Sequence, residues 1–170
     1  LFFGMYVPSV SFVFLKDSDD LAHALATGME GDVRLDALSR RLYATDASIY
    51  EVEPVGVILP RTTADVVHAV RVAGERGLSL LPRGGGTSLA GQAVGESLQV
   101  DFSRYMNRIL EVDAAGRWAR VEPGVVLDEL NASLAGKGLM FGPDVSTSSR
   151  ANLGGMIGNN SCGAHSIIHG

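Results

Sequence analysis

Two glycine-rich stretches decide how this chain is interpreted: residues 83–92 read RGGGTSLAGQ, and residues 142–170 read GPDVSTSSRANLGGMIGNNSCGAHSIIHG. The chain has 21 glycines in 170 residues, above the usual share of about 7%, and they concentrate at 84–95 and 154–170. Evenly spread glycine would indicate a linker, whereas clustered glycine indicates backbone that approaches a ligand closely. The two stretches are therefore the candidate binding segments.

The first stretch begins with six residues, 83–88, directly after a predicted strand. Successive backbone N–H groups without Cβ crowding can form a concave anion site, and the hydroxyls of Thr87 and Ser88 add donors. This arrangement suits a phosphate or pyrophosphate. The loop lacks the lysine of GxxxxGK[ST], and GxGxxG would need glycine in place of Leu89, so neither common nucleotide motif applies. A tight loop without a ligand is the alternative.

The second stretch contains LGGMIGNNSCG at residues 153–163. Its paired glycines permit close approach, and its asparagines can both donate and accept hydrogen bonds. Such a segment can hold ribityl hydroxyls and the edges of a flavin ring. An irregular loop with asparagines in turns is the alternative.

Composition narrows the class of protein. A length of 170 residues fits one domain, and 46% hydrophobic with 19% charged residues is typical of a soluble globular chain. The net charge of −5 argues against nucleic acid as a partner, because binding phosphates needs a basic surface. The single cysteine, Cys162, permits no intrachain disulfide, and no Cys/His spacing suits a metal. We expect a cytoplasmic location, with peripheral association at the inner membrane left open.

Residues 1–16 form an apolar segment of open status. Pro8, the absence of a basic n-region and a length below the ~20 residues that span a bilayer argue against a membrane anchor. Because the segment does not begin with Met, a fragment boundary, a misplaced start and a native strand are all kept open. The fold prediction therefore covers residues 17–170.

The remaining pattern predicts an α+β chain. Thr62-x-x-Asp65 resembles a capping box for a helix over 63–76, with Val66, Val70 and Ala73 on one face and Gly77 after its end. The other predicted elements are two short helices within 17–50 broken at Gly28, strands at 55–59, 79–82, 98–101, 109–113 and 118–122, and a helix from Val126 to Gly136. The strands at 109–113 and 118–122 should form a hairpin that turns at Ala115-Gly116. Nothing regular is predicted after Phe141.

Taken together and in this order, the two stretches resemble the FAD-binding domain of the vanillyl-alcohol oxidase and p-cresol methylhydroxylase (PCMH) superfamily. The similarity is greater to the branch containing glycolate oxidase, D-lactate dehydrogenases and D-2-hydroxyglutarate dehydrogenases. YATDASIYEVEPVGVILPRTTADVVHAVRVA, at residues 43–73, resembles the segment before the first loop in this branch. The resemblance, from Tyr43 to Gly170, implies a PCMH-type fold of two small α/β subdomains with FAD between them, incomplete at its C-terminus.

The resemblance also assigns residues to the cofactor. The first loop would wrap the pyrophosphate, and the second stretch would approach the rest of FAD. The residues so assigned are Arg83, Gly84, Gly85, Gly86, Thr87, Ser88, Gln92, Pro143, Asp144, Ser148, Gly154, Gly155, Asn160, Gly163, Ser166 and Ile168. Thr87 stands where some relatives attach flavin covalently through a histidine, so noncovalent FAD is expected. No metal is expected, and catalytic residues are expected beyond Gly170.

The function implied is that of a D-2-hydroxy-acid dehydrogenase, in which hydride passes from the substrate to flavin N5. Reoxidation would need a quinone, an electron-transfer protein or a fused iron–sulfur domain, and this chain alone should show little or no turnover. Three alternatives stay open. They are another flavoenzyme of the superfamily, such as an alcohol oxidase or the reductase of cell-wall precursor synthesis; a truncated chain that no longer binds FAD; and a generic phosphate-binding module.

Several other residues invite a functional interpretation that we do not favour. His165 and His169 are not expected to act as general bases, although an unperturbed imidazole titrates near pH ~6.5. Cys162 is expected to be a packing residue, and Trp118 a core residue. The pair Asp128-Glu129 is expected on the solvated face of its helix, near the N-terminus, where the dipole favours negative charge.

Overall fold

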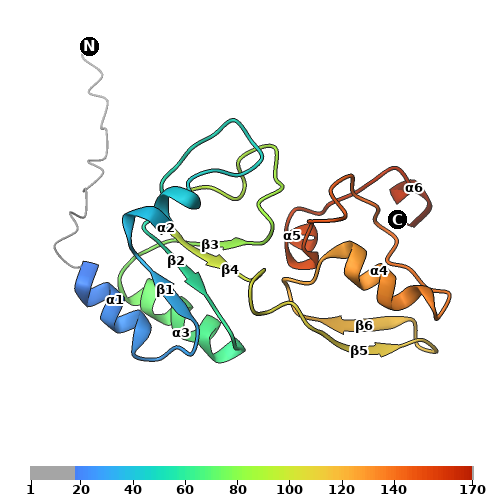
Figure 1. Cartoon of the computed structure of the whole chain (residues 1–170), viewed down its shortest axis with the longest axis horizontal. Coiled ribbons are helices and arrows are strands. Elements are labelled where there is room, and N and C mark those ends of the chain that lie inside the picture. The colour runs from blue at the N-terminus through green and yellow to red at the C-terminus, as the bar shows by residue number, and fades with distance from the viewer. Residues whose placement is uncertain (1–17, 170) are drawn as a thin grey trace, which may run out of the picture.

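The computed structural model describes residues 18–169 and forms two lobes that lie side by side (Figure 1). The apolar segment at 1–16 lies outside the described residues. The N-terminal lobe, residues 18–101, contains α1 (Ser18–Ala26), β1 (Asp32–Arg34), α2 (Ala37–Leu42), β2 (Gly56–Leu59), α3 (Thr63–Glu75), β3 (Leu80–Arg83) and β4 (Leu98–Asp101). The C-terminal lobe, residues 107–169, contains β5 (Ile109–Asp113), β6 (Trp118–Val121), α4 (Leu127–Ala135), α5 (Leu153–Gly158) and α6 (Ser166–His169).

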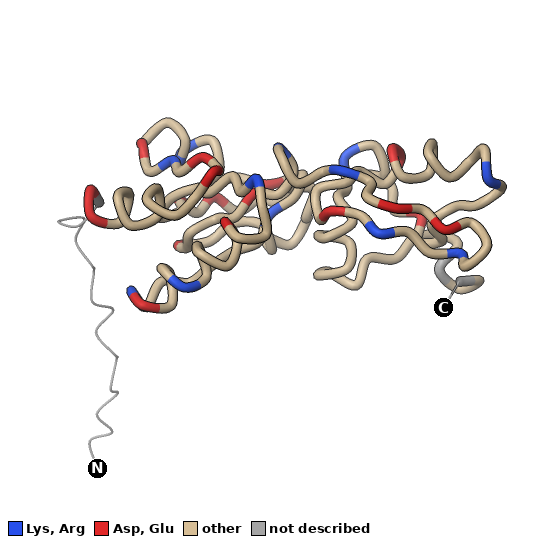
Figure 2. The backbone as a smooth tube through the Cα atoms, turned by 90° about the horizontal axis from the view of Figure 1, so that it is seen from below, with Lys and Arg blue, Asp and Glu red and all other residues tan. Residues whose placement is uncertain are grey.

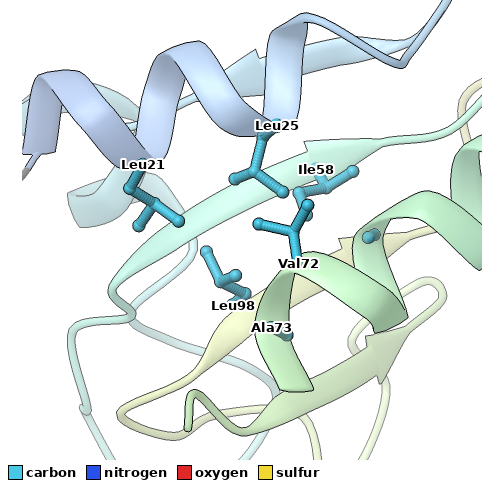
Figure 3. Close-up of a cluster of buried hydrophobic side chains, with 7 residues drawn as sticks. Leu21, Leu25, Ile58, Val72, Ala73 and Leu98 are labelled. Carbon is cyan, nitrogen blue, oxygen red and sulfur yellow. The ribbon is translucent and has the colours of Figure 1, made fainter. Parts of the chain in front are cut away.

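The N-terminal lobe is organised around a four-stranded sheet in the order β1-β2-β4-β3. β2, β4 and β3 run parallel, and β1 joins the edge antiparallel to β2. Ile58 and Leu98 of the sheet pack against side chains of α1 and α3, which together bury Leu21, Leu25, Val72 and Ala73 (Figure 3). One sheet face is thus closed by two helices, which leaves the other face and the strand ends to position a site.

Helix α3 begins and ends as its sequence predicts. The Oγ1 of Thr62 accepts from the Asp65 amide at 3.1 Å, the Asp65 carboxylate accepts from the Thr62 amide at 3.2 Å, and Gly77 has φ +64°. The predicted face is confirmed at Ala73, which is buried, and wrong at Val70, which is exposed. Ala69 and Val72 are the other buried apolar residues of the helix. The capping carboxylate is itself buried, so the cap fixes the rotation of the helix and small Ala69 comes to face the sheet.

The rest of this lobe shows two further differences from prediction. The two short helices are confirmed as α1 and α2, but the strand β1 between them is not predicted because its three residues, DVR, carry no β pattern. Leu38 and Leu42 of α2 are 71% and 67% exposed, so their helical spacing does not mark a core face.

The C-terminal lobe packs α4 and α5 on the predicted hairpin of β5 and β6. The hairpin is confirmed, and the chain reverses through residues 114–117 with Arg117 at φ +56°. α4 is confirmed with Val126 as its N-cap, and Asp128 and Glu129 are exposed in its first turn, as predicted. Its core joins Val125, Leu127, Leu130, Leu134, Ala151, Leu153 and Met156.

Three predictions for this lobe are wrong. The segment after Phe141 contains α5 and α6, which are too short and too rich in glycine for a visible helical period. Trp118 is 43% exposed on a two-stranded hairpin and is not a core residue. Cys162 is exposed and is not a packing residue.

A short connection, residues 102–106, joins the lobes. The Gly124 amide donates to the Met106 carbonyl at 2.8 Å, and the Phe102 amide donates to the Arg83 carbonyl at 3.1 Å. A Cβ at Gly124 would lie 2.2 Å from the Phe102 carbonyl oxygen, so only glycine fits this crossing. Within residues 18–169, acidic and basic positions are intermixed over both lobes (Figure 2), and no helix is long and apolar enough to cross a membrane.

Candidate cofactor site

A cavity of about 620 Å³ lies where the two lobes meet. Small-molecule sites usually have volumes of about 300–1,000 Å³. The N-terminal lobe supplies the end of β3 and the glycine loop that follows it, and the C-terminal lobe supplies α5 with the residues on either side. The two glycine-rich stretches therefore face the same cavity.

Nine of the sixteen residues that the resemblance assigns to FAD line the cavity. They are Arg83, Gly84, Gly85, Gly86, Thr87, Ser88, Gln92, Gly154 and Gly155. The seven that are not among its lining residues are Pro143, Asp144, Ser148, Asn160, Gly163, Ser166 and Ile168.

Thirteen further lining residues are not assigned individually by the resemblance, although those from 145 to 161 lie within the second candidate stretch. They are Leu81, Pro82, Ala93, Phe102, Pro123, Val145, Thr147, Ala151, Asn152, Met156, Gly158, Asn159 and Ser161. An N-cap pattern could have pointed to Asn152, since Asn commonly precedes the first turn of a helix. Phe102 and Pro123 carry no local signal, because the crossing between the lobes brings them to the cavity.

The glycines of the first loop lie against the other lobe. A Cβ at Gly84 would come within 2.6 Å of the Asn152 Oδ1, and a Cβ at Gly85 within 2.4 Å of the Arg150 carbonyl oxygen. Real Cβ atoms do not approach other atoms this closely. These two glycines thus allow the loop to lie directly on residues 150–152.

The paired glycines of α5 differ from each other. A Cβ at Gly154 would lie 2.7 Å from the Pro123 Cβ, so this position is closed by packing within the C-terminal lobe. Around a Cβ at Gly155, no described atom lies within 4 Å. Gly155 therefore leaves the cavity open toward α5.

Asn152 holds the centre of the contact between the lobes and is 4% exposed. Its Nδ2 donates to the Gly124 carbonyl at 2.6 Å, which orients the amide. Although Asn152 is the N-cap residue of α5, its side chain makes no capping bond, and within the described chain its buried Oδ1 has no hydrogen-bond partner. Buried polar atoms are normally paired, so this oxygen marks a place where a donor is missing.

Asp144 and His165 form a hydrogen-bonded pair beside the site. The Asp144 carboxylate accepts from the His165 amide at 3.0 Å and contacts the ring Nδ1. These hydrogen bonds from His165, the backbone one first, lower the pKa of Asp144 below its ordinary value. A Cβ at Gly163 would lie 2.0 Å from the Asp144 carbonyl oxygen, so glycine at position 163 allows the backbone there to lie directly against Asp144.

The chemistry of the cavity wall fits FAD. Within residues 18–169 the wall includes no carboxylate, and Arg83 is its one charged side chain. Backbone amides and hydroxyls of the glycine loop suit phosphate oxygens, and Phe102, Val145 and Met156 offer apolar surface to a ring. A mixed wall of this kind suits a ligand that joins phosphates to aromatic rings.

The fold and the cavity define a two-lobed domain whose cavity, lying between the lobes, suits a nucleotide-like ligand. Residues 54–170 match the family described as "FAD binding domain", and the chain belongs to this family. The resemblance found in the sequence is thereby confirmed, and FAD is the cofactor that the family defines.

Curated relatives agree. The chain is similar to a D-2-hydroxyglutarate dehydrogenase of Pantoea ananatis, at 48% identity over 85% of this chain, and to one of Escherichia coli, at 44% identity over 84% of this chain. It is also 34% identical to the glycolate oxidase protein GlcD of Bacillus subtilis over 77% of its length. The chain spans 14% of the length of the first two relatives and 28% of the third.

Solved structures confirm the predicted fold class. An alkyldihydroxyacetonephosphate synthase superposes with a TM-score of 0.75 at 23% identity, covering 85% of this chain and 32% of that one. p-Cresol methylhydroxylase superposes with a TM-score of 0.70 at 18% identity, covering 85% of this chain and 29% of that one. At these identities the likeness concerns the fold alone.

Proposed function

We propose that this chain is the FAD-binding portion of a D-2-hydroxy-acid dehydrogenase and that it holds FAD noncovalently in the cavity between its lobes. The observation that carries the proposal is the meeting of both glycine-rich stretches at one cavity whose described wall has no carboxylate. The 48% identity to a D-2-hydroxyglutarate dehydrogenase supports the substrate class. The chemistry that bound FAD supplies is acceptance of a hydride at flavin N5 from the α-carbon of the hydroxy acid.

The residues of this chain would bind and orient the cofactor. Gly84, Gly85 and Gly86 present backbone to the cavity, and Thr87 and Ser88 present hydroxyls, so the loop suits the pyrophosphate. Gly155 leaves room at α5, and Gln92, whose Oε1 contacts the Ser88 hydroxyl, closes the loop on itself. In this proposal the chain positions the cofactor, and its wall places no negative charge beside the phosphates.

The proposal depends less on the seven assigned residues that do not line the cavity. Asp144 accepts from the His165 amide and lies against Gly163. Pro143 and Ser148 lie in the connection between α4 and α5, and Asn160 lies in the connection between α5 and α6. Ser166 and Ile168 lie in α6, which is four residues long. The electron acceptor, whether quinone, electron-transfer protein or iron–sulfur domain, and the cytoplasmic location stay predictions.

The test is equilibrium binding of FAD, riboflavin and ADP to the purified chain, followed by flavin absorbance and fluorescence. We expect FAD to bind more tightly than either half-ligand, and acid precipitation to release all flavin into the supernatant. Flavin that stays with the precipitate would contradict noncovalent attachment. Equal affinity for ADP and FAD, without affinity for riboflavin, would favour a generic phosphate-binding module.

The substrate class is tested with the complete polypeptide that carries these residues. Anaerobic mixing with D-2-hydroxyglutarate, D-lactate or glycolate should bleach the flavin absorbance, whereas L-2-hydroxyglutarate should not. Bleaching by an alcohol or by none of these acids would favour another flavoenzyme of the superfamily.

A further inference from the structure

Strand β4 carries two polar residues where a central strand is normally apolar. Its sequence is LQVD, and all four residues are buried. Leu98 and Val100 lie on the face that packs against α1 and α3, because Leu98 belongs to that core and side chains alternate along a strand. Gln99 and Asp101 therefore share the opposite face. Buried polar side chains need partners, and here the partners lead to the glycine loop.

Gln99 is fully buried and bonds in two directions. Its Oε1 accepts from the Arg83 Nη1 at 3.2 Å, and its Nε2 donates to the Tyr43 carbonyl at 3.0 Å. Asp101 accepts from the Tyr43 hydroxyl at 2.6 Å. Burial, followed by the hydrogen bond to Asp101, raises the pKa of Tyr43 above its ordinary value, so the hydroxyl stays a donor. A polar network thus covers the sheet face away from the helices.

Arg83 connects this network to three backbone segments. Its Nη1 also donates to the Tyr43 carbonyl at 3.1 Å and to the Ala93 carbonyl at 2.8 Å, and its Nη2 donates to the Thr45 carbonyl at 2.7 Å. The Gly86 carbonyl accepts from the Ala47 amide at 3.0 Å. The start, the middle and the far end of the glycine loop are therefore tied to residues 43–47 and to the sheet.

The position of the Arg83 side chain also explains why residue 86 is a glycine. Gly86 has φ +62°, and a Cβ there would lie 2.8 Å from the Arg83 Nη2. The guanidinium therefore lies beneath the loop at the point where the backbone turns. All the hydrogen bonds that the structure describes for this guanidinium go to protein oxygens of its own, N-terminal lobe.

We propose that Arg83, Gln99 and Tyr43 form a positioning network that holds the glycine loop in its ligand-ready shape, and that Arg83 acts through this loop rather than as a phosphate ligand. The proposal rests on the proposed function, since the loop is taken to bind the FAD pyrophosphate. A run of three glycines loses more backbone freedom on ordering than other residues do. Anchors that order the loop beforehand remove this cost from binding.

The test compares Arg83→Lys and Gln99→Met with Arg40→Lys in the purified chain. Arg83→Lys keeps the charge but cannot reach four oxygens, and Gln99→Met removes the central polar group without any change of charge at a residue outside the cavity wall. Arg40 is the matched control, because it is half-buried in the same lobe and donates to a backbone carbonyl, that of Pro54, at 2.9 Å.

The first readout needs no ligand and is hydrogen exchange of the Ala47 and Ala93 amides, which donate to the Gly86 carbonyl and to the Asp46 carboxylate and so tie the loop to residues 43–47. In both test variants this exchange should become about tenfold faster, while exchange in α3 and exchange in the Arg40→Lys control stay as in the parent. The second readout is ligand selectivity. Both variants should weaken FAD about tenfold and leave riboflavin unchanged, because only the pyrophosphate meets the loop.

The outcomes separate the two proposals. Unchanged exchange of the Ala47 and Ala93 amides in both variants overturns the positioning role, whatever the affinity for FAD. Equal acceleration in α3 shows general destabilisation and also overturns it. Full affinity for FAD in Arg83→Lys, with loss in an uncharged Arg83→Gln, would make Arg83 a phosphate ligand instead. If the parent chain binds no FAD but the loop still loosens in the variants, the positioning network is supported and the proposed function is contradicted.

Discussion

The two glycine-rich stretches line one cavity, but their glycines serve different purposes. Gly84 and Gly85 are closed off by the opposite lobe, at 2.6 Å from Asn152 and 2.4 Å from Arg150. Gly155 lines the cavity, and the space around a Cβ placed there is open. Gly84 and Gly85 of the first stretch therefore bring the two lobes together, whereas Gly155 of the second stretch leaves room at the cavity wall.

A glycine pattern therefore marks a site but does not identify which of its glycines contacts the ligand. The family resemblance assigns all of these positions to close approach of FAD. The structure separates glycines needed by protein packing, at 84, 85, 154 and 163, from Gly155, which is not needed by packing. Substitutions at the two kinds of position should thus fail for different reasons.

The largest effect is expected for Gly85→Val. The new Cβ meets the Arg150 carbonyl oxygen at 2.4 Å, and since backbone lies on both sides, the lobes must separate. We expect the free energy of unfolding to fall by about 1–3 kcal/mol. The Kd for FAD should rise about 100-fold, equivalent to about 2.7 kcal/mol. Chemical denaturation and flavin titration measure the two quantities.

Gly95→Val is the control for this variant. It lies near the same loop, and its Cβ meets ordinary contacts at 3.6 and 3.7 Å. It should change both quantities far less. Parent-like affinity in Gly85→Val would show that the loop does not need to lie on residues 150–152.

A smaller effect, on affinity alone, is expected for Gly155→Val. The side chain enters open cavity space, so it should raise the Kd for FAD about 30-fold, or about 2 kcal/mol, without loss of stability. Gly74→Val is the matched control, because Gly74 also lies in a helix with no described atom within 4 Å of its Cβ, but on α3. If both variants bind FAD equally well, the cavity beside α5 is not the cofactor site.

Asn152→Ala should lower both the stability of the chain and its affinity for FAD, each by a smaller amount than Gly85→Val. Removing the side chain leaves the Gly124 carbonyl without its 2.6 Å donor, which should cost about 1–2 kcal/mol of unfolding free energy. The Kd for FAD should rise about fivefold, since the contact between the lobes loosens. Asn131→Ala is the comparison, because it removes a side-chain bond to the Phe141 amide away from the cavity and should lower stability only. Unchanged stability in Asn152→Ala would contradict its place at the joint.

The smallest effect on the cavity is expected for Asp65→Asn, which should leave the Kd for FAD unchanged. Burial raises the pKa of Asp65, but bonds from the Arg61, Glu30 and Thr62 amides outweigh burial and hold it below its ordinary 3.8. The carboxylate thus contributes stability above pH 3.8, and that contribution is lost as the pH falls toward the lower folded pKa.

The variant should therefore be less stable by about 1–3 kcal/mol at neutral pH, with the difference from the parent shrinking in acid. Thermal unfolding at a series of pH values measures it. A difference that is constant with pH would show that the charge of Asp65 is not responsible.

Much of the fold could be predicted because its signals are local. The capping box at Thr62 and Asp65, the hairpin at 109–121 and the glycine loop after β3 each depend on neighbours in sequence. Strand β1 could not be predicted, because three residues with a polar majority form a strand only when β2 offers them a partner. The short helix α5 likewise depends on Val125 and Pro123, which accept its first amides.

The family and the cofactor can be identified without any three-dimensional information, because two ordered glycine stretches within 54–170 carry enough local pattern for both. Folding set the role of each residue. It turned Arg83 toward protein oxygens, placed Gly84 and Gly85 against the opposite lobe and left Gly155 open. The physical reason is that these roles depend on contacts between segments far apart in the chain, and such contacts are absent from any local pattern of residues.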